Sequence, residues 1–323
     1  DIENKTINEL VKFTDAFLSP QHITSMISKY MVLYEASKSL MVLRPYQIYA
    51  VEQIVHRAKT SDKNGYIWHT TGSGKTLTSF KASQIMMQLP DVTKVLFVVD
   101  RNDLDTQTSR EFNAFKEDSV DSTDNTSTLV KQLEQSHDKL IVTTIQKLNR
   151  AISNDRYAKQ IEYLKNENVI FIFDECHRSQ FGETHQNIKK FFHQAQMFGF
   201  TGTPIFEENS QSKAGLKLTT DYLFNDCLHR YVIVDAIRDR NVLQFQIDYR
   251  GKYTAKGLEA DTNYNDDVEG IDTQELYDNP QRLEMITRYI VDTHDTKTRK
   301  REFTGMFCVS SVKTLTQYYE LFE

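Results

Sequence analysis

The sequence predicts an α/β fold built on a parallel β-sheet with flanking helices. Three observations lead to this prediction. Short apolar runs recur between residues 66 and 203, segments of helical length separate them, and the runs are near-continuously apolar rather than alternating. Strands of this kind, joined by crossover helices, are typical of parallel sheets that are covered on both faces. The predicted strands are YIWHT, VLFVVD, LIVTTI, VIFIFD and MFGFTGT.

Residues 1–43 predict a helical lead-in segment. Apolar residues recur there at helical spacing, and Pro20 is a predicted helix start. The residues that carry this spacing are Ile23, Met26, Ile27, Tyr30, Met31 and Tyr34.

Beyond the lead-in, the sequence predicts one main domain over residues 44–250 and the start of a second. Residues 251–280 are rich in Asp, Glu, Asn and Gly and predict an acidic linker. Residues 281–323 predict a helix at Gln281–Ile290, a buried strand in GMFCVSSV at 305–312 and a further helix in KTLTQYYELF. We therefore expect the second domain to be incomplete in this chain.

Charge and cysteine content restrict the classes of function. The 45 acidic residues outnumber the 39 basic ones and give a net charge of −6, so any contact with nucleic acid must be local. Cys176, Cys227 and Cys308 lie far apart and predict reduced thiols. No stretch reaches the roughly 18 apolar residues of a membrane span, and the acidic N-terminus is unlike a signal peptide. We expect a cytoplasmic protein with no membrane contact.

The segment HTTGSGKT, residues 69–76, predicts a phosphate-binding loop because it follows a predicted strand and precedes a helix. The backbone N–H groups of Gly72, Ser73 and Gly74 can turn toward phosphate oxygens. Lys75 would then contact the β and γ phosphates of ATP, and the Thr76 hydroxyl would ligate Mg²⁺.

A strict GxxxxGK[ST] pattern is not satisfied, because His69 stands where the first glycine would be. The alternative for the whole segment is a Gly/Ser-rich turn before a helix. For His69 itself, packing or hydrogen bonding is favoured over catalysis.

Asp174 and Glu175 follow the apolar run VIFIF, at the carboxyl end of a predicted parallel strand. Asp174 is suited to hold Mg²⁺ through water, and Glu175 to act as the base that orients or deprotonates the attacking water. His177 is a candidate for coupling this site to its neighbours. The alternatives are a solvated turn for the two carboxylates and a surface histidine for His177.

Zinc binding is not predicted. The spacings of Cys176, His177, His185 and His193 do not match those of zinc ligand pairs.

Four ordered segments resemble the motifs of superfamily 2 helicases. HTTGSGKT, DECH and TGTP resemble motifs I, II and III, and RPYQ at residues 44–47 resembles the adenine-contacting Q motif. Within that superfamily, VVDRNDLDTQ, TTIQK at 143–147 and LHRYVIVDAIRDRNVLQFQIDY at 228–249 resemble the motor subunits of type I restriction enzymes. The resemblance implies a RecA-like motor domain followed by the start of a second RecA-like domain.

The resemblance also implies roles for individual residues. Gln47, with Arg44 nearby, would recognise adenine, since an amide both donates and accepts. Thr201 and Thr203 would link the state of ATP to the grip on DNA. The alternatives are a helix-surface glutamine and threonines that terminate a strand.

Four further residues fall in segments that face nucleic acid in the family. They are Arg101, Gln107, Thr143 and Thr144. Side chains of these kinds bind phosphate without reading sequence. A solvated loop or a helix cap is the alternative for each.

By resemblance, the chain is an ATP-dependent translocase on double-stranded DNA that works with methyltransferase and specificity subunits. We find no D…ExK nuclease constellation, and the arginine that the second motor domain would supply is missing, which can lower hydrolysis by factors near 10³–10⁵. The alternatives are another superfamily 2 helicase or repair translocase, a non-hydrolysing ATP-dependent scaffold, and a small-molecule kinase. The last would leave TGTP and RPYQ unexplained.

Overall fold

The computed structural model describes residues 5, 7–34, 37–99, 125–135, 140–176, 181–207, 212–213, 216–217, 219–247 and 279–323. The chain divides into two compact units, Asp1–Gln246 and Ile247–Glu323. The division falls shortly before the predicted boundary at residue 250, and residues 251–278 of the predicted linker lie outside the described ranges.

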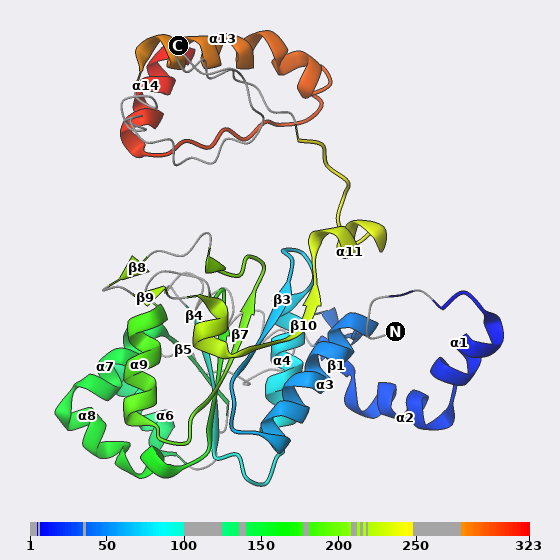
Figure 1. Ribbon diagram of the computed structural model, residues 1–323, viewed down its shortest axis with the longest axis vertical. Coiled ribbons are helices and arrows are strands. Elements are labelled where there is room, and N and C mark those ends of the chain that lie inside the picture. The colour runs from blue at the N-terminus through cyan, green and yellow to red at the C-terminus, as the bar shows by residue number, and fades with distance from the viewer. Residues whose placement is uncertain are drawn as a thin grey trace. The chain divides into compact units, whose positions relative to one another are not determined.

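Unit 1 is built on a six-stranded sheet in the order β10-β3-β7-β6-β4-β5 (Figure 1). Every neighbouring pair is parallel, so the predicted α/β class is confirmed. The five predicted strands are all present, and β10 is an additional edge strand that was not predicted. The strands are β3 Gly65–His69, β4 Lys94–Val99, β5 Leu140–Thr144, β6 Val169–Asp174, β7 Gln196–Thr201 and β10 Asp226–Tyr231.

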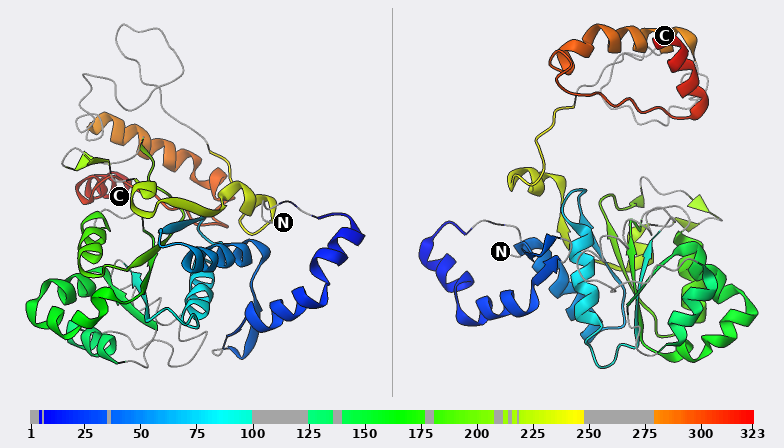
Figure 2. Two further views of the ribbon diagram at one scale, coloured as in Figure 1. Left: turned by 60° about the horizontal axis from the view of Figure 1, so that its bottom comes forward. Right: turned by 180° about the vertical axis from the view of Figure 1, so that it is seen from behind.

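Helices cover both faces of this sheet (Figure 2). One face carries α3, Pro45–Thr60, and α4, Lys75–Met86. The other face carries α6 Thr126–Glu134, α7 Ile145–Ser153, α8 Asp155–Gln160 and α9 Phe181–Phe191. Unit 1 also contains several short elements. They are the 3-10 turn Glu162–Asn166, α10 Thr220–Phe224, α11 Ile233–Arg238 and the two-residue strands β8 Ser212–Lys213 and β9 Leu216–Lys217.

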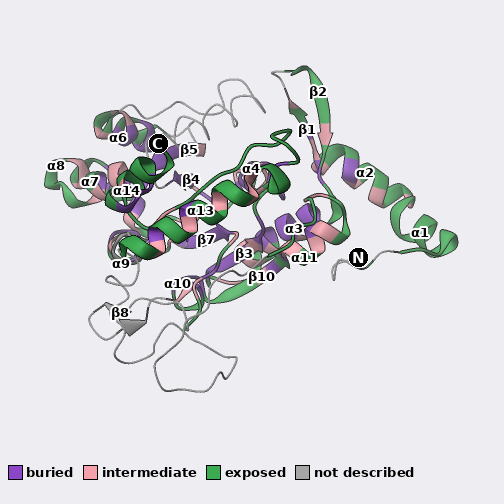
Figure 3. Ribbon diagram, turned by 90° about the horizontal axis from the view of Figure 1, so that it is seen from above, coloured by how far each residue is buried: buried purple, intermediate pink, exposed green. Residues whose placement is uncertain are grey.

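Two hydrophobic clusters fill the space between the sheet and its helices. In β4, Val95 and Phe97 pack into the cluster under α3 and α4, whereas Leu96 and Val98 pack into the cluster under α6, α7 and α9. Successive residues of a strand point to opposite faces, so a strand covered on both sides must be apolar throughout. Figure 3 shows the resulting burial of the central strands.

The N-terminal segment differs in part from its prediction. Helices α1, Leu10–Phe17, and α2, Pro20–Lys29, are present, and α2 begins at Pro20 after a Ser19 side chain that accepts a hydrogen bond from His22 N. The helical prediction is wrong beyond Lys29, where β1, Met31–Tyr34, pairs antiparallel with β2, Ser39–Val42. This pairing satisfies the backbone groups of the MVLY segment in place of a helix.

Unit 2 contains the two predicted helices but not the predicted strand. Helix α13 spans Pro280–Lys297 and α14 spans Val312–Phe322. Residues 305–310 form no strand, and Met306 is 92% exposed. A buried strand needs a neighbour to satisfy its backbone, and the described part of unit 2 contains no other strand.

None of the helices in the described ranges has both the length and the apolar character needed to cross a lipid bilayer.

Candidate functional site

The predicted phosphate-binding loop joins the end of β3 to the start of α4. Gly72 and Gly74 both have positive φ, at 79° and 76°. These values favour glycine, because a Cβ is strained there. At Gly74, an added Cβ would also lie 2.7 Å from Gln47 Nε2. The loop therefore requires glycine at Gly74 for its backbone conformation and for the close approach of α3.

Hydrogen bonds inside the loop hold its shape. The Ser73 hydroxyl donates to the carbonyl oxygen of Thr70 at 2.6 Å, and the Thr78 hydroxyl donates to that of Gly74 at 3.0 Å. Ser73 is buried. Its hydroxyl is thus committed to the loop itself.

Gln47 and Tyr46, from the first turn of α3, contact the loop from outside. The Gln47 amide donates to the carbonyl oxygens of Ser73 and Gly74, both at 3.2 Å, and its Oε1 accepts from Arg44 N at 2.9 Å. Gln47 is 4% exposed, so the alternative of a helix-surface glutamine is wrong. In this structure the amide supports the loop, and Arg44 remains exposed beside it.

Lys75 and Glu175 meet although they are far apart in the sequence. Lys75 Nζ lies 3.4 Å from Glu175 Oε1, and the two side chains are 10% and 28% exposed. Lys75 begins α4 and Glu175 follows β6, while β7 separates β3 from β6 in the sheet. The carboxyl ends of parallel strands share one edge of the sheet, which explains how this pair forms.

The turn after β6 fixes the direction of the two carboxylates. Glu175 has a positive φ of 47°, which is uncommon for a residue with a side chain. Its backbone N–H donates to Asp174 Oδ1 at 3.0 Å. Asp174 and Thr76 are both half-buried. A hydroxyl and a carboxylate are the hard oxygen donors that Mg²⁺ prefers, so the residue types fit this ion.

The TGTP segment lies against the phosphate-binding loop. A Cβ on Gly202 would lie 3.4 Å from the carbonyl oxygen of His69, and the Trp68 indole donates to the Gly202 carbonyl at 3.2 Å. Thr201 is buried at the end of β7, and its hydroxyl accepts from Thr203 N at 3.0 Å. His177, the other predicted coupling residue, lies outside the described residues.

Two of the four predicted DNA-contacting residues, Thr143 and Thr144, lie in the described part of the chain. Arg101 and Gln107 lie outside the described residues. Thr143 and Thr144 are fully buried, and the Thr144 hydroxyl accepts from Lys147 N at the start of α7. This is a correction for Thr144, which has the helix-capping role of the alternative; a buried hydroxyl is not presented to a phosphate backbone.

Sequence reasoning missed two aromatic residues near the loop, His229 and Tyr231, whereas it favoured packing or hydrogen bonding for His69. His69 and His229 are buried side by side, with His69 Nε2 2.9 Å from His229 Nδ1. Burial, together with His229 and the positive charge of Lys75, lowers the pKa of His69 well below its usual value. Tyr231 stacks on Tyr46. LHRY carried these residues in the sequence, but it is the end of the edge strand β10, which has no apolar run to mark it.

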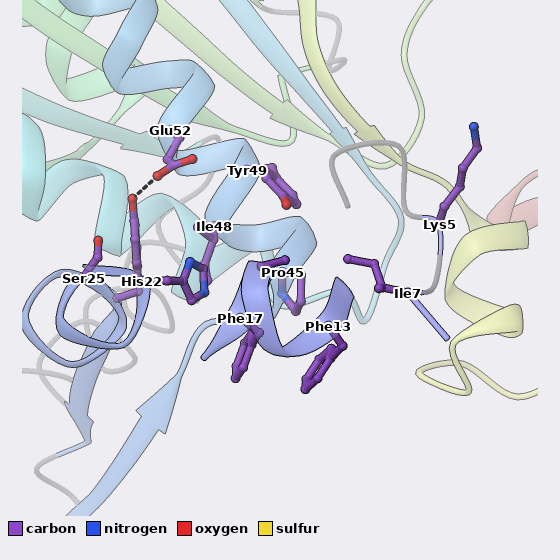
Figure 4. Close-up of a pocket in the computed structure, with 12 residues that line it drawn as sticks. Lys5, Ile7, Phe13, Phe17, His22, Ser25, Pro45, Ile48, Tyr49 and Glu52 are labelled. Atoms are coloured by element: carbon purple, nitrogen blue, oxygen red, sulfur yellow. Dashed lines mark hydrogen bonds between the residues drawn. The ribbon is translucent and has the colours of Figure 1, made fainter. Parts of the chain in front are cut away.

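A separate cavity of about 410 Å³ lies between the N-terminal segment and α3 (Figure 4). Pro45, Ile48, Tyr49 and Glu52 line it from α3, and Phe13 and Phe17 from α1. None of residues 70–76 lines this cavity. It is therefore distinct from the phosphate-binding loop.

A glycine-rich loop that leads into a Lys-Thr pair, opposed by an Asp-Glu pair on another parallel strand, defines the class of P-loop nucleoside triphosphatases. The chain matches the SWI2/SNF2 ATPase family over residues 46–281 and belongs to it. The RecA-like sheet implied by the sequence resemblance agrees with the six-stranded parallel sheet observed.

Known relatives place the chain among the endonuclease subunits of type I restriction enzymes. The SsaAORF53P endonuclease subunit of Staphylococcus saprophyticus is 52% identical over 323 residues, which cover 100% of this chain and 34% of the relative. A Mycoplasma pneumoniae protein, the C-terminal part of the putative MpnIIP endonuclease subunit, is 44% identical over 59% of this chain and 98% of its own length.

A solved structure, a nuclease-deletion mutant of the Type ISP restriction-modification enzyme LlaGI in complex with a DNA substrate mimic, is 21% identical. Its TM-score is 0.48 over 62% of this chain and 21% of that chain. The present chain spans about a third of the length of the staphylococcal relative.

Proposed function

We propose that this chain is the ATP-binding part of a type I restriction enzyme motor, in which ATP hydrolysis drives movement along double-stranded DNA. The observation that carries the proposal is the pairing of Lys75 with Glu175 at 3.4 Å, at the mouth of a glycine-rich loop. The pair connects the segments that follow β3 and β6, at the edge of the sheet where P-loop enzymes bind phosphate.

Each residue of the pair has its own task. The Lys75 ammonium contacts the β and γ phosphates, and Glu175 orients the attacking water and accepts its proton. Asp174 and the Thr76 hydroxyl would hold Mg²⁺, which would supply neutralising charge. Lys75 and Glu175 pair with each other in the structure described here, so phosphate contact by Lys75 releases the Glu175 carboxylate for its role as base.

Other predicted residues complete the proposal. Arg44, which is exposed at the start of α3, meets the adenine, whereas Gln47 acts on the base only if its amide leaves the loop carbonyls. Thr201, Thr203 and His177 couple the nucleotide site to DNA. The contact of TGTP with the loop at Gly202 supports this coupling.

The proposed partners are double-stranded DNA and the methyltransferase and specificity subunits, in the bacterial cytoplasm. The names of the relatives support a restriction system. The DNA substrate mimic in the LlaGI complex agrees with a nucleic-acid partner. Arg101 and Gln107 remain proposed DNA contacts on the ground of the sequence resemblance.

The test is ATP hydrolysis by the complete protein with its partner subunits, measured with and without duplex DNA that carries the target. We expect strong duplex-dependent turnover that Glu175→Gln lowers by about 10²-fold or more, since a positioned base contributes this much. Glu162→Gln is the matched control, because Glu162 is exposed and pairs with the neighbouring Lys165.

ATP hydrolysis that does not depend on duplex DNA, or that is stimulated by single-stranded DNA or RNA, would point instead to another superfamily 2 motor. Turnover that survives Glu175→Gln would remove the catalytic assignment.

A further inference from the structure

Two stacked tyrosines connect the phosphate-binding loop to the turn that follows α11. The rings of Tyr46 and Tyr231 are 3.7 Å apart between centroids and lie 4° from parallel. Both side chains are buried, and they form a small hydrophobic cluster with Ala236, against which Val242 packs. Rings stacked this closely move together.

On one side, the stacked pair holds the phosphate-binding loop. The Tyr46 hydroxyl donates to the Ser73 carbonyl at 2.8 Å, and the Tyr231 carbonyl accepts from Thr70 N at 2.9 Å. Ser73 and Thr70 are themselves joined through the Ser73 hydroxyl. A change in the loop backbone around phosphate therefore acts directly on both tyrosines.

On the other side, the pair holds the turn at residues 239–242. The Tyr231 hydroxyl donates to Asp239 Oδ2 at 2.9 Å and accepts from Asn241 Nδ2 at 2.6 Å. The backbone N–H groups of Asn241 and Val242 both donate to the Ala236 carbonyl. Burial raises the pKa of both tyrosines, so their hydroxyls stay protonated and continue to donate.

This turn leads to the segment of chain that leaves unit 1. Residues 243–246 are all exposed, Leu243 is 89% exposed, and unit 1 ends at Gln246. Val242 also approaches the loop directly, since a Cβ on Gly72 would lie 3.8 Å from Val242 Cγ2. The turn is thus the last part of unit 1 with buried contacts to the loop.

We propose that Tyr46 and Tyr231 are positioning residues that transmit the state of the phosphate-binding loop to the turn at residues 239–242. The inference rests on the proposed nucleotide-binding function. A movement of the Ser73 carbonyl acts on the Tyr46 hydroxyl and, through the ring stack, on Tyr231. Tyr231 then changes its hydrogen bonds to Asp239 and Asn241. The segment that leaves unit 1 is held when the loop is ordered and released when it is not.

The test measures hydrogen exchange in the complete protein with and without Mg·ADP. In the unmodified protein, Mg·ADP slows exchange at the amides of Asn241 and Val242 by about fivefold or more, as expected when one net hydrogen bond is strengthened. Tyr231→Phe keeps the ring stack but removes the hydrogen bonds to Asp239 and Asn241. We expect it to bind Mg·ADP within about twofold of the unmodified affinity and to lose the nucleotide response of the turn.

Two further variants separate coupling from stability. Tyr46→Phe removes the bond to Ser73 and weakens Mg·ADP binding by about fivefold, again the equivalent of one net hydrogen bond. Asn241→Ala removes one output bond without touching either ring. Tyr222→Phe is the matched control, because Tyr222 is exposed on α10. If Tyr231 were merely structural, Tyr231→Phe would raise the exchange rates of Asn241 and Val242 equally with and without Mg·ADP. If Tyr231 couples the two sites, the variant changes the difference between the rates measured with and without Mg·ADP.

A nucleotide response at Asn241 and Val242 that is the same in Tyr231→Phe and Tyr222→Phe would overturn the inference. So would an unmodified protein that binds Mg·ADP while the turn does not respond. If Mg·ADP does not bind, or binds equally well to Lys75→Ala, the proposed function fails and the coupling fails with it. The two failures are therefore distinguishable.

Discussion

At the scale of single residues, the phosphate-binding loop depends on close approaches that only certain side chains allow. Gly74 combines a positive φ with a position beside the Gln47 amide. His69, the first residue of the HTTGSGKT segment, is buried against another histidine and near a lysine. Both residues serve the geometry of the loop without supplying reactive groups. The direct effect of substituting either residue is therefore a change in the free energy of unfolding.

We predict that Gly74→Ala lowers the free energy of unfolding by more than the roughly 1–2 kcal/mol that a left-handed backbone costs a residue with a Cβ. The excess arises because the new Cβ displaces the Gln47 amide from Ser73 and Gly74. Urea unfolding measures the effect. In a Gln47→Ala background the cost shrinks to the backbone part, whereas equal costs in the two backgrounds would contradict the explanation. Gly305→Ala, with open space around it, is the control.

We predict that His69 makes the protein less stable in mild acid. Its pKa is lowered by burial, so the unfolded chain binds a proton near pH 6.5 that the folded chain does not bind. The free energy of unfolding therefore falls as the pH drops below about 6.5. His185, whose pKa burial lowers to about 4, adds to the same trend.

Urea unfolding at several pH values checks this prediction. His69→Gln has a shallower loss of stability between pH 6.5 and 5 than the unmodified protein, whereas His56→Gln, an exposed control, keeps the original slope. Identical slopes for His69→Gln and the unmodified protein would contradict it.

At the scale of elements, the sequence predicted those parts whose pattern is local. The five predicted strands are apolar because both faces of the sheet are covered, and α2 begins at a proline after a capping serine. Both features are visible in the sequence. The β1–β2 hairpin was missed because Tyr30 and Met31 continue the helical spacing of α2, and only the tertiary pairing of Met31 with Val42 decides against a helix. The partners of Gln47 were missed for the same reason.

Burial of Lys94 is another element-scale feature that only tertiary structure explains. Lys94 begins β4 and is 1% exposed, and its ammonium donates to the carbonyl oxygens of Gln132 and Gln135 at the end of α6. A cation at a helix C-terminus satisfies carbonyls that have no partner within the helix.

We predict that Lys94→Met lowers the free energy of unfolding by about 2 kcal/mol, because it leaves buried carbonyl groups without this donor. Hydrogen exchange of α6 should rise locally, with thermal or urea unfolding as the global measure. Lys63→Met, at an exposed position, is the control. Unchanged exchange in α6 would show that Lys94 does not hold the helix end.

At the scale of the whole molecule, the nucleotide site lies within one of the two units. The phosphate-binding loop, Glu175, Tyr46 and Tyr231 all belong to Asp1–Gln246. Both large hydrophobic clusters also lie within this unit. Residues 305–310 of unit 2 form no strand, so the predicted second domain is represented by helices.

We predict that a chain ending at Gln246 folds and binds Mg·ADP within about twofold of the affinity of the complete chain, because the proposed phosphate-binding and Mg²⁺-binding residues all belong to Asp1–Gln246. Isothermal titration calorimetry measures the affinity, and circular dichroism checks the fold. Loss of binding with the fold retained would show that unit 2 contributes to the site.

The indole of Trp68 is an intrinsic fluorescent probe at the edge of the sheet. It is the only tryptophan of the chain, and it hydrogen-bonds the Gly202 carbonyl in the TGTP segment, one residue before the strand reaches His69. Its emission depends on that hydrogen bond and on the water around a half-buried ring. The protein can therefore be followed in stopped flow without any attached dye, at the point where the TGTP segment meets the end of β3.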